Sequence, residues 1–101
     1  MKTLQVFLSS IKTACLNYQT EYNVLPSSTE NYLLTEILTG KNSRGIEFIS
    51  IQPKYLNANK EMVDPYGTPY RITFAPDKDP LVISAGKDLI FGTKDDLRSD
   101  K

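Results

Sequence analysis

Apolar residues recur at every third or fourth position over the first part of the chain, which is the spacing of one face of an α-helix. This pattern predicts a single long helix over residues 3–23. Pro26 is expected to end it, because the residue before a proline is disfavoured in the helical conformation. The predicted apolar stripe consists of Leu4, Phe7, Leu8, Ile11, Ala14, Cys15, Tyr18 and Tyr22.

A second, shorter helix is predicted over residues 30–39. Ser27 and Glu30 have the spacing of a capping box at its start, and Gly40 occupies the position of a C-terminal glycine cap. The apolar face predicted for this helix consists of Tyr32, Leu33, Leu34, Ile37 and Leu38.

The later part of the chain has the pattern of a small sheet. Residues 41–63 predict a long connection in which residues 45–51 form a short irregular strand. The stretch Asp64-Pro65-Tyr66-Gly67 matches a type I turn. Residues 70–74 alternate between apolar and polar positions, as a half-buried strand does, and residues 81–85 predict a second strand antiparallel to the first.

Together these elements predict one α+β domain, in which the long N-terminal helix packs on a small antiparallel sheet. A chain of 101 residues with 40% hydrophobic residues is near the usual size for one hydrophobic core. We divide it into the helix at residues 1–25, the second helix with a variable connection at 26–63, and the sheet with an acidic loop at 64–101.

Composition removes several classes of function. Lys+Arg and Asp+Glu both number 12, so no positive excess is available to neutralise a nucleic-acid backbone. The chain has no histidine, which is the usual general base and the commonest zinc ligand. The single cysteine, Cys15, lies on the predicted apolar stripe and is expected to be a buried hydrophobe. With no nucleophile–base pair, we expect neither an enzyme nor a small-molecule substrate.

Residues 84–97 contain the strongest candidate for a binding site, because three aspartates are concentrated there. Carboxylates close together repel one another unless a proton, a cationic side chain or a metal compensates. Calcium takes 6 to 8 oxygen ligands, and softer metals are disfavoured without nitrogen or sulfur donors. The alternative is a solvated turn in which the carboxylates cap backbone amides and neighbouring lysines offset their charge. The acidic residues concerned are Asp88, Asp95 and Asp96.

Three motifs carry a resemblance to a known family. The stretch from Asp64 to Tyr70 (DPYGTPY) resembles the DPWGxPY block of the major pseudopilins of type II secretion systems. Ser84–Asp88 and Gly92–Leu97 are similar to the same family's SxGxDGxxGTxDDI tail. The motifs follow in the family's order and span most of the chain. The family's helix ending, an aromatic and an acid before a proline, is similar to Tyr18, Glu21, Tyr22 and Leu25-Pro26.

The resemblance implies a type IV pilin-like fold and a structural role. Such subunits polymerise with copies of themselves and with minor pseudopilins into a periplasmic pseudopilus that helps to export folded proteins. Their apolar first half of the helix anchors them in the inner membrane, and we expect that half to precede this sequence.

The resemblance also implies a calcium site in the C-terminal loop. Matched position by position, carboxylates come from Asp88, Asp95 and Asp96, and backbone carbonyls from Ala85, Ile90 and Thr93. Leu89 stands where the family has a glycine, so a positive φ at this residue would be strained.

Two other functions remain open at this point. One is a type IV pilin-like minor subunit that acts in adhesion or DNA uptake. The other is a free-standing periplasmic or extracellular calcium-dependent binding module. A leader and about 20 apolar residues encoded upstream of Met1 would indicate a pilin-like subunit, whereas their absence would favour the module.

Overall fold

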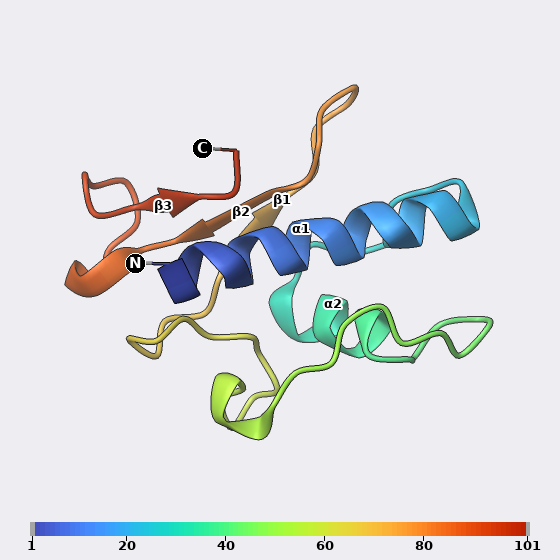
Figure 1. The fold of residues 1–101 in the computed structure, drawn as a ribbon, viewed down its shortest axis with the longest axis horizontal. Helices are drawn as coiled ribbons and strands as arrows, with labels where there is room; N and C mark the ends of the chain where they lie inside the picture. The colour runs from blue at the N-terminus through green and yellow to red at the C-terminus, as the bar shows by residue number, and fades with distance from the viewer. Residues whose placement is uncertain (1, 101) are drawn as a thin grey trace.

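The computed structural model describes residues 2–100 of the chain, and the side chains of residues 5–100. It is an α+β fold with a long N-terminal helix, a short second helix and a three-stranded antiparallel sheet in the order β1-β2-β3, as Figure 1 shows. The elements are α1 (Lys2–Tyr22), α2 (Asn31–Leu38), β1 (Arg71–Thr73), β2 (Leu81–Ser84) and β3 (Leu97–Arg98), with 3-10 turns η1 (Pro53–Tyr55) and η2 (Gly86–Asp88).

Helix α1 is the central element of the fold. The sheet lies on one side of it, and α2 with the connection that follows lies on the other (Figure 1). The predicted stripe of α1 is confirmed for most of its length, and Leu4 lies outside the described side chains. The buried core consists of Leu8, Ile11, Ala14, Cys15, Leu34, Leu38, Met62, Tyr70, Ile72 and Val82.

Asn23 ends helix α1, three residues before the proline that was expected to do so. Asn23 adopts a left-handed conformation with φ 63°, and its N–H donates to the Gln19 carbonyl at 2.8 Å. Asparagine tolerates this conformation better than most residues, so the helix stops at Tyr22. The prediction of the helix is confirmed, but the reason given for its end is wrong.

Helix α2 is confirmed over Asn31–Leu38 with one cap as predicted and one not. The capping box of Ser27 and Glu30 is wrong, because Glu30 is itself the N-cap and makes no side-chain capping bond. At the other end the Lys41 N–H donates to the Glu36 carbonyl at 2.9 Å, and Gly40 has φ 129°. This is the bonding of a Schellman cap, as predicted from the glycine.

A buried asparagine, Asn31, joins α2 by hydrogen bonds to the segment that precedes β1. The side-chain amide of Asn31 donates to the carbonyls of Met62 and Tyr70 at 2.9 and 3.0 Å, and its oxygen accepts from the Met62 N–H at 2.6 Å. Asn31 is only 8% exposed. Its position on the inner face of α2 was not predicted, whereas Tyr32, assigned to the apolar face, is exposed.

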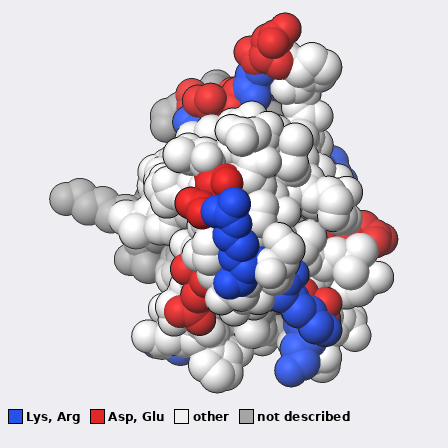
Figure 2. Space-filling view, turned by 90° about the vertical axis from the view of Figure 1, so that its right-hand side faces the viewer, with Lys and Arg blue, Asp and Glu red and all other residues white. Residues whose placement is uncertain are grey.

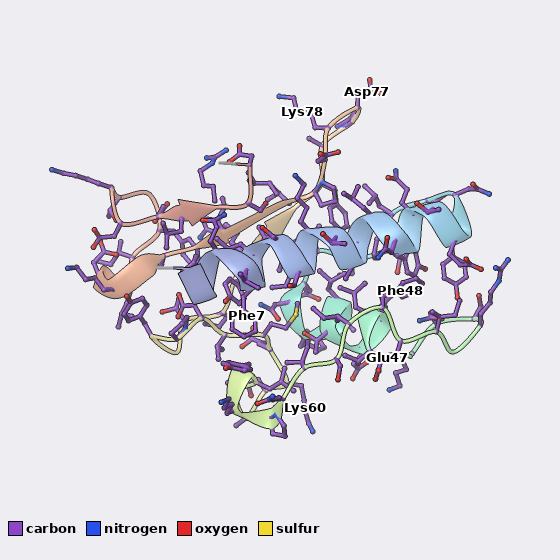
Figure 3. All side chains as sticks on the ribbon, in the orientation of Figure 1. Phe7, Glu47, Phe48, Lys60, Asp77 and Lys78 are labelled. Carbon is purple, nitrogen blue, oxygen red and sulfur yellow. The ribbon has the colours of Figure 1, made fainter. Side chains whose placement is uncertain are left out.

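The strand predicted at residues 45–51 does not form. The N–H groups of Phe48 and Ile49 both donate to the Leu38 carbonyl, so this segment follows the end of α2. Phe48 packs against Tyr18 with ring centroids 5.4 Å apart. Figure 3 places Phe48 between α1 and the connection, whereas Lys60 lies on the outer side. Side-chain packing on the helices therefore replaces strand pairing here.

The sheet confirms two strands and adds a third. The Gly67 N–H donates to the Asp64 carbonyl at 2.9 Å, as the predicted turn requires. Strands β1 and β2 pair antiparallel with Ile72 opposite Val82. Strand β3, which was not predicted, pairs with the other edge of β2. Two residues are too few to show an alternating pattern.

The sole cysteine is buried as predicted. Cys15 has no exposed surface, and burial raises the pKa of its thiol to about 12. The thiolate, which is the reactive form, is therefore disfavoured at neutral pH.

Charged side chains of both signs are interspersed on the face shown in Figure 2, which gives no continuous positive surface there. Within residues 2–100, no helix is both long enough and apolar enough to cross a bilayer.

Candidate functional site

The acidic loop, residues 85–96, joins the central strand β2 to the edge strand β3. It projects beyond the sheet at the end of the molecule where α1 begins (Figure 1). The turn η2 opens the loop, and Leu89 follows it with φ 63°. The positive φ considered for Leu89 from the sequence is therefore present. Because the Leu89 side chain is 55% exposed, it meets little crowding from the rest of the protein.

The base of the loop rests on a buried carboxylate. Asp64 is 3% exposed, and its Oδ1 accepts hydrogen bonds from the N–H groups of Tyr66 and Thr68, both at 3.0 Å. Its Oδ2 accepts from the Ser84 hydroxyl at 2.7 Å. All three donors are neutral, and together they satisfy a charge that would be costly to bury alone.

Ser84 connects Asp64 to the acidic loop by a second hydrogen bond. Its side chain is fully buried, and its Oγ accepts a hydrogen bond from the Gly86 N–H at 3.2 Å. Gly86 has φ 78°, and a Cβ built on it would overlap the Asp95 carbonyl oxygen. Glycine is therefore required, and the two ends of the loop touch through their backbones. Through the Asp64–Ser84 hydrogen bond, two of the three motifs that carry the family resemblance meet in space.

Asp88 organises the outer part of the loop. Its Oδ1 accepts from the Ile90 N–H at 3.1 Å, and its Oδ2 accepts from the Thr93 hydroxyl at 2.6 Å. The Thr93 hydroxyl and then the Ile90 N–H hold the pKa of the Asp88 carboxyl below its ordinary value. Three of the predicted site residues are therefore brought together as a hydrogen-bonded turn.

Asp95 and Asp96 occupy the returning side of the loop. The Asp95 N–H donates to the Thr93 hydroxyl oxygen at 3.2 Å. One Asp96 oxygen, Oδ2, accepts from the Gly92 N–H at 2.8 Å. The other, Oδ1, is buried without a hydrogen-bond partner among the described residues. A buried acceptor without a partner is unusual, so this oxygen marks where a cation or a further donor would be favourable.

The predicted carboxylates do not converge on one point. In the described part of the chain, no group of three or more acidic, histidine or cysteine side chains is close enough to hold a metal ion. Asp88 and Asp96 each bind separate donors of the loop, and Ala85 is buried at its base. The arrangement resembles the capped turn that was the alternative interpretation of these residues.

The donor chemistry nevertheless fits a hard divalent cation. The oxygens available to such an ion are carboxylates and backbone carbonyls, which calcium prefers and binds in irregular geometry. Asp96 Oδ1 is the observation in favour, because an ion would satisfy it. Calcium would be held by Asp96 first, with Asp88 and Asp95 as further carboxylates.

An aromatic contact fixes the tip of the loop to the sheet. The guanidinium carbon of Arg71 in β1 lies 4.2 Å from the centroid of the Phe91 ring. A cation over an aromatic face at this distance is favourable. The loop is therefore attached to the sheet at its base by Ser84 and at its tip by Phe91.

Sequence reasoning missed Asp64 and Ser84 as parts of this site. Asp64 was assigned to its turn and to the first family-like motif, and Ser84 to its strand and to the second, but neither was given a role at the site. Strand alternation was the available signal, because it places Ser84 on the same inner face as Val82. A hydroxyl on a buried face needs a hydrogen-bond partner.

Comparisons with protein-family models, with curated proteins and with solved structures found no match to this chain.

Proposed function

We propose that this chain is a non-enzymatic structural subunit of a type II secretion pseudopilus, stabilised by calcium in the acidic loop. The observation that carries the proposal is the contact between the two family-like motifs, made by Asp64 and Ser84 at 2.7 Å. Residues 20 positions apart in the sequence are thereby joined as parts of one unit. The long helix α1 packed on an antiparallel sheet is also the arrangement expected of a type IV pilin-like fold.

A structural rather than catalytic role accords with the side chains present. The chain has no histidine, and burial raises the pKa of its only thiol to about 12. A buried, protonated thiol is a poor nucleophile. The partners we propose are further copies of the chain and minor pseudopilins, with the complete subunit held at the periplasmic face of the inner membrane.

The calcium component is tested by thermal unfolding of the chain in excess chelator and in calcium. An ion that binds only the folded state stabilises it by about 2.7 kcal/mol at 100 times its Kd. For a domain of this size we therefore expect the melting temperature to rise by about 10–20 °C. Magnesium at the same concentration should have a smaller effect, because it demands stricter octahedral geometry.

Charge-neutralising variants identify the ligands. We expect Asp96→Asn and Asp88→Asn to reduce or abolish the calcium-dependent rise. Asp77→Asn is the matched control, because Asp77 lies at the tip of the exposed β1–β2 connection (Figure 3) and should leave the rise intact. If calcium does not change the melting temperature of the unmodified chain, its proposed role is wrong.

The filament component needs a separate experiment. The chain would be expressed as its natural gene product with a photo-crosslinking residue in place of Tyr55. Crosslinks between copies that disappear when the secretion machinery is deleted would support a pseudopilus subunit. A fully monomeric, uncrosslinked protein under secretion conditions, with replacements at several surface positions, would contradict it.

A further inference from the structure

Two hydrogen bonds link Asp64 to the acidic loop by way of Ser84, and their donors fix the direction of each. The Gly86 N–H can only donate, so Ser84 Oγ accepts that bond and its own proton goes to Asp64 Oδ2. Asp64 Oδ1 already accepts two backbone N–H groups. The arrangement therefore requires an acceptor on both oxygens of residue 64, as an ionised carboxylate provides.

Water cannot readily replace these contacts, because Ser84 has no exposed surface and Asp64 is 3% exposed. If either side chain is removed, buried polar groups are left without partners. The Gly86 N–H is the group at the loop end of this chain of contacts. Its position therefore depends directly on Ser84 and indirectly on Asp64.

Gly86 is in close contact with the segment that carries Asp95 and Asp96. Its Cα packs so closely on the Asp95 backbone that no side chain fits between them. Asp95 and Asp96 follow one another on the returning side of the loop, and the Asp96 N–H donates to the Thr93 carbonyl at 3.3 Å. A displacement of Gly86 therefore displaces the carboxylates that would bind the ion.

From this geometry we propose that Asp64 and Ser84 are positioning residues of the cation site. They do not touch the ion; they hold the acidic loop in place through Gly86 and so raise its affinity for calcium. This inference rests on the proposed calcium role. Residues that orient metal ligands from behind typically change metal affinity by about 10–100-fold when they are replaced.

The principal test compares Asp64→Asn and Ser84→Ala with the unmodified chain. In Asp64→Asn the two backbone donors keep the amide oxygen at the Oδ1 position, so the amide nitrogen faces Ser84 and the serine proton loses its acceptor. In Ser84→Ala the Gly86 N–H loses its acceptor. We expect each variant to raise the calcium Kd by about 10–100-fold by calorimetry.

Amide hydrogen exchange without calcium separates loop positioning from ion binding. Both variants should accelerate exchange at Gly86 and across residues 86–96, while the core amides of α1 stay protected. Asp77→Asn and Ser50→Ala, at exposed positions, are the matched controls and should change neither measurement.

A double variant gives the sharpest outcome. Because Asp64 acts on the loop through Ser84, Asp64→Asn combined with Ser84→Ala should raise the Kd no more than Ser84→Ala alone. Additive losses would overturn this route, as would an unchanged Kd in both single variants. If Asp64→Asn does not fold, Ser84→Ala still decides the inference through the same two measurements.

The outcome also distinguishes this inference from the proposed function. An unmodified chain that binds no calcium overturns both the proposed calcium role and the coupling to affinity. Faster loop exchange in the variants would then show only that the pair holds the loop. Unchanged loop exchange overturns the inference even where the unmodified chain binds calcium normally.

Discussion

Leu8 and Leu34 have no exposed surface where α1 meets α2, whereas Leu89 and Ile90 in the acidic loop are 55% and 61% exposed. The helical core is held by buried apolar surface, which acts without direction and depends little on ions. The loop is held by carboxylates, two hydroxyls and one close backbone contact, which depend on exact geometry and, for the carboxylates, on charge. Changes in salt, pH or metal-ion concentration should therefore destabilise the loop before they destabilise the core.

The two regions also differ in how they open, because one requires global unfolding and the other can open locally. A region with many buried apolar contacts opens only with global unfolding, whereas a region held by a few polar contacts opens locally at lower free energy. Under the proposed function, the acidic loop is where an added ion would change the stability of the protein. The core supplies a rigid support for it.

The largest expected effect is in the core. Leu34→Ala removes a fully buried side chain and should lower the free energy of unfolding by about 2–5 kcal/mol in denaturant titrations. Val24→Ala, at a 60% exposed position, is the control and should change it by less than about 0.5 kcal/mol. The proposed calcium affinity of the loop should not change with it, and a parallel change in affinity would show that the core and the loop are not independent.

A polar contact inside the core should be nearly as costly to remove. Asn31→Leu removes the side-chain partner of the Met62 N–H and of the Tyr70 carbonyl, and leaves the Met62 carbonyl with the Tyr70 N–H alone. We therefore expect the free energy of unfolding to fall by about 2–3 kcal/mol. Asn17→Leu, at an exposed position of α1, is the matched control. Equal stability of the two variants would mean that the Asn31 contacts contribute nothing.

At the base of the loop, Gly86→Ala adds a Cβ that overlaps Asp95 and also places alanine at a positive φ. We expect a loss of about 1–3 kcal/mol, seen mainly as faster hydrogen exchange in residues 86–96. Gly92→Ala shares a positive φ but has open space around the added Cβ. The excess loss in Gly86→Ala therefore measures the backbone contact, and no excess would disprove its importance.

Alkaline pH should affect the core through its thiol. Burial raises the pKa of Cys15 from 9.0 to about 12, so the folded state keeps a proton that the unfolded state loses above pH 9. The stabilisation is complete below pH 9 and is lost at about 1.4 kcal/mol per pH unit above it. Unfolding of Cys15→Ala should lack this component between pH 9 and 10. An identical pH slope in both proteins would rule it out.

The smallest expected effect is a gain. Leu89→Gly removes the strain of a left-handed conformation at an exposed position. Glycine also gives the unfolded chain more conformational freedom, which offsets part of this gain. The free energy of unfolding should therefore rise by about 0.5 kcal/mol. Ile90→Gly, at the next exposed position and without positive φ, should instead lower it. If both variants are destabilised equally, Leu89 is not strained.

Apolar periodicity was sufficient to predict the two helices and the strands β1 and β2. Their buried residues repeat at fixed spacing, so the sequence records which face is covered. The segment at 45–51 shows the limit of this signal. Its apolar residues pack on the helices, and a short alternating run does not distinguish that from strand pairing.

The acidic loop could be predicted in its donor chemistry but not in its geometry. Sequence indicates that Asp88 and Asp96 are close along the chain, yet each carboxylate binds different loop amides and hydroxyls. The contact of Asp64 with Ser84 joins positions 20 residues apart and depends on how the turn packs against β2. Local patterns contain no information about such a pairing.

The connection between β1 and β2 stands away from the body of the protein, with Asp77 and Lys78 at its tip (Figure 3). Residues 75–79 are all exposed, and Asp79 forms an ion pair with Lys12 of α1 at 3.5 Å. Exposed loop tips of this kind accept inserted sequence with little effect on folding. An epitope or a fluorescent label spliced between Asp77 and Lys78 would therefore report on the intact molecule from a point remote from both the helical core and the acidic loop.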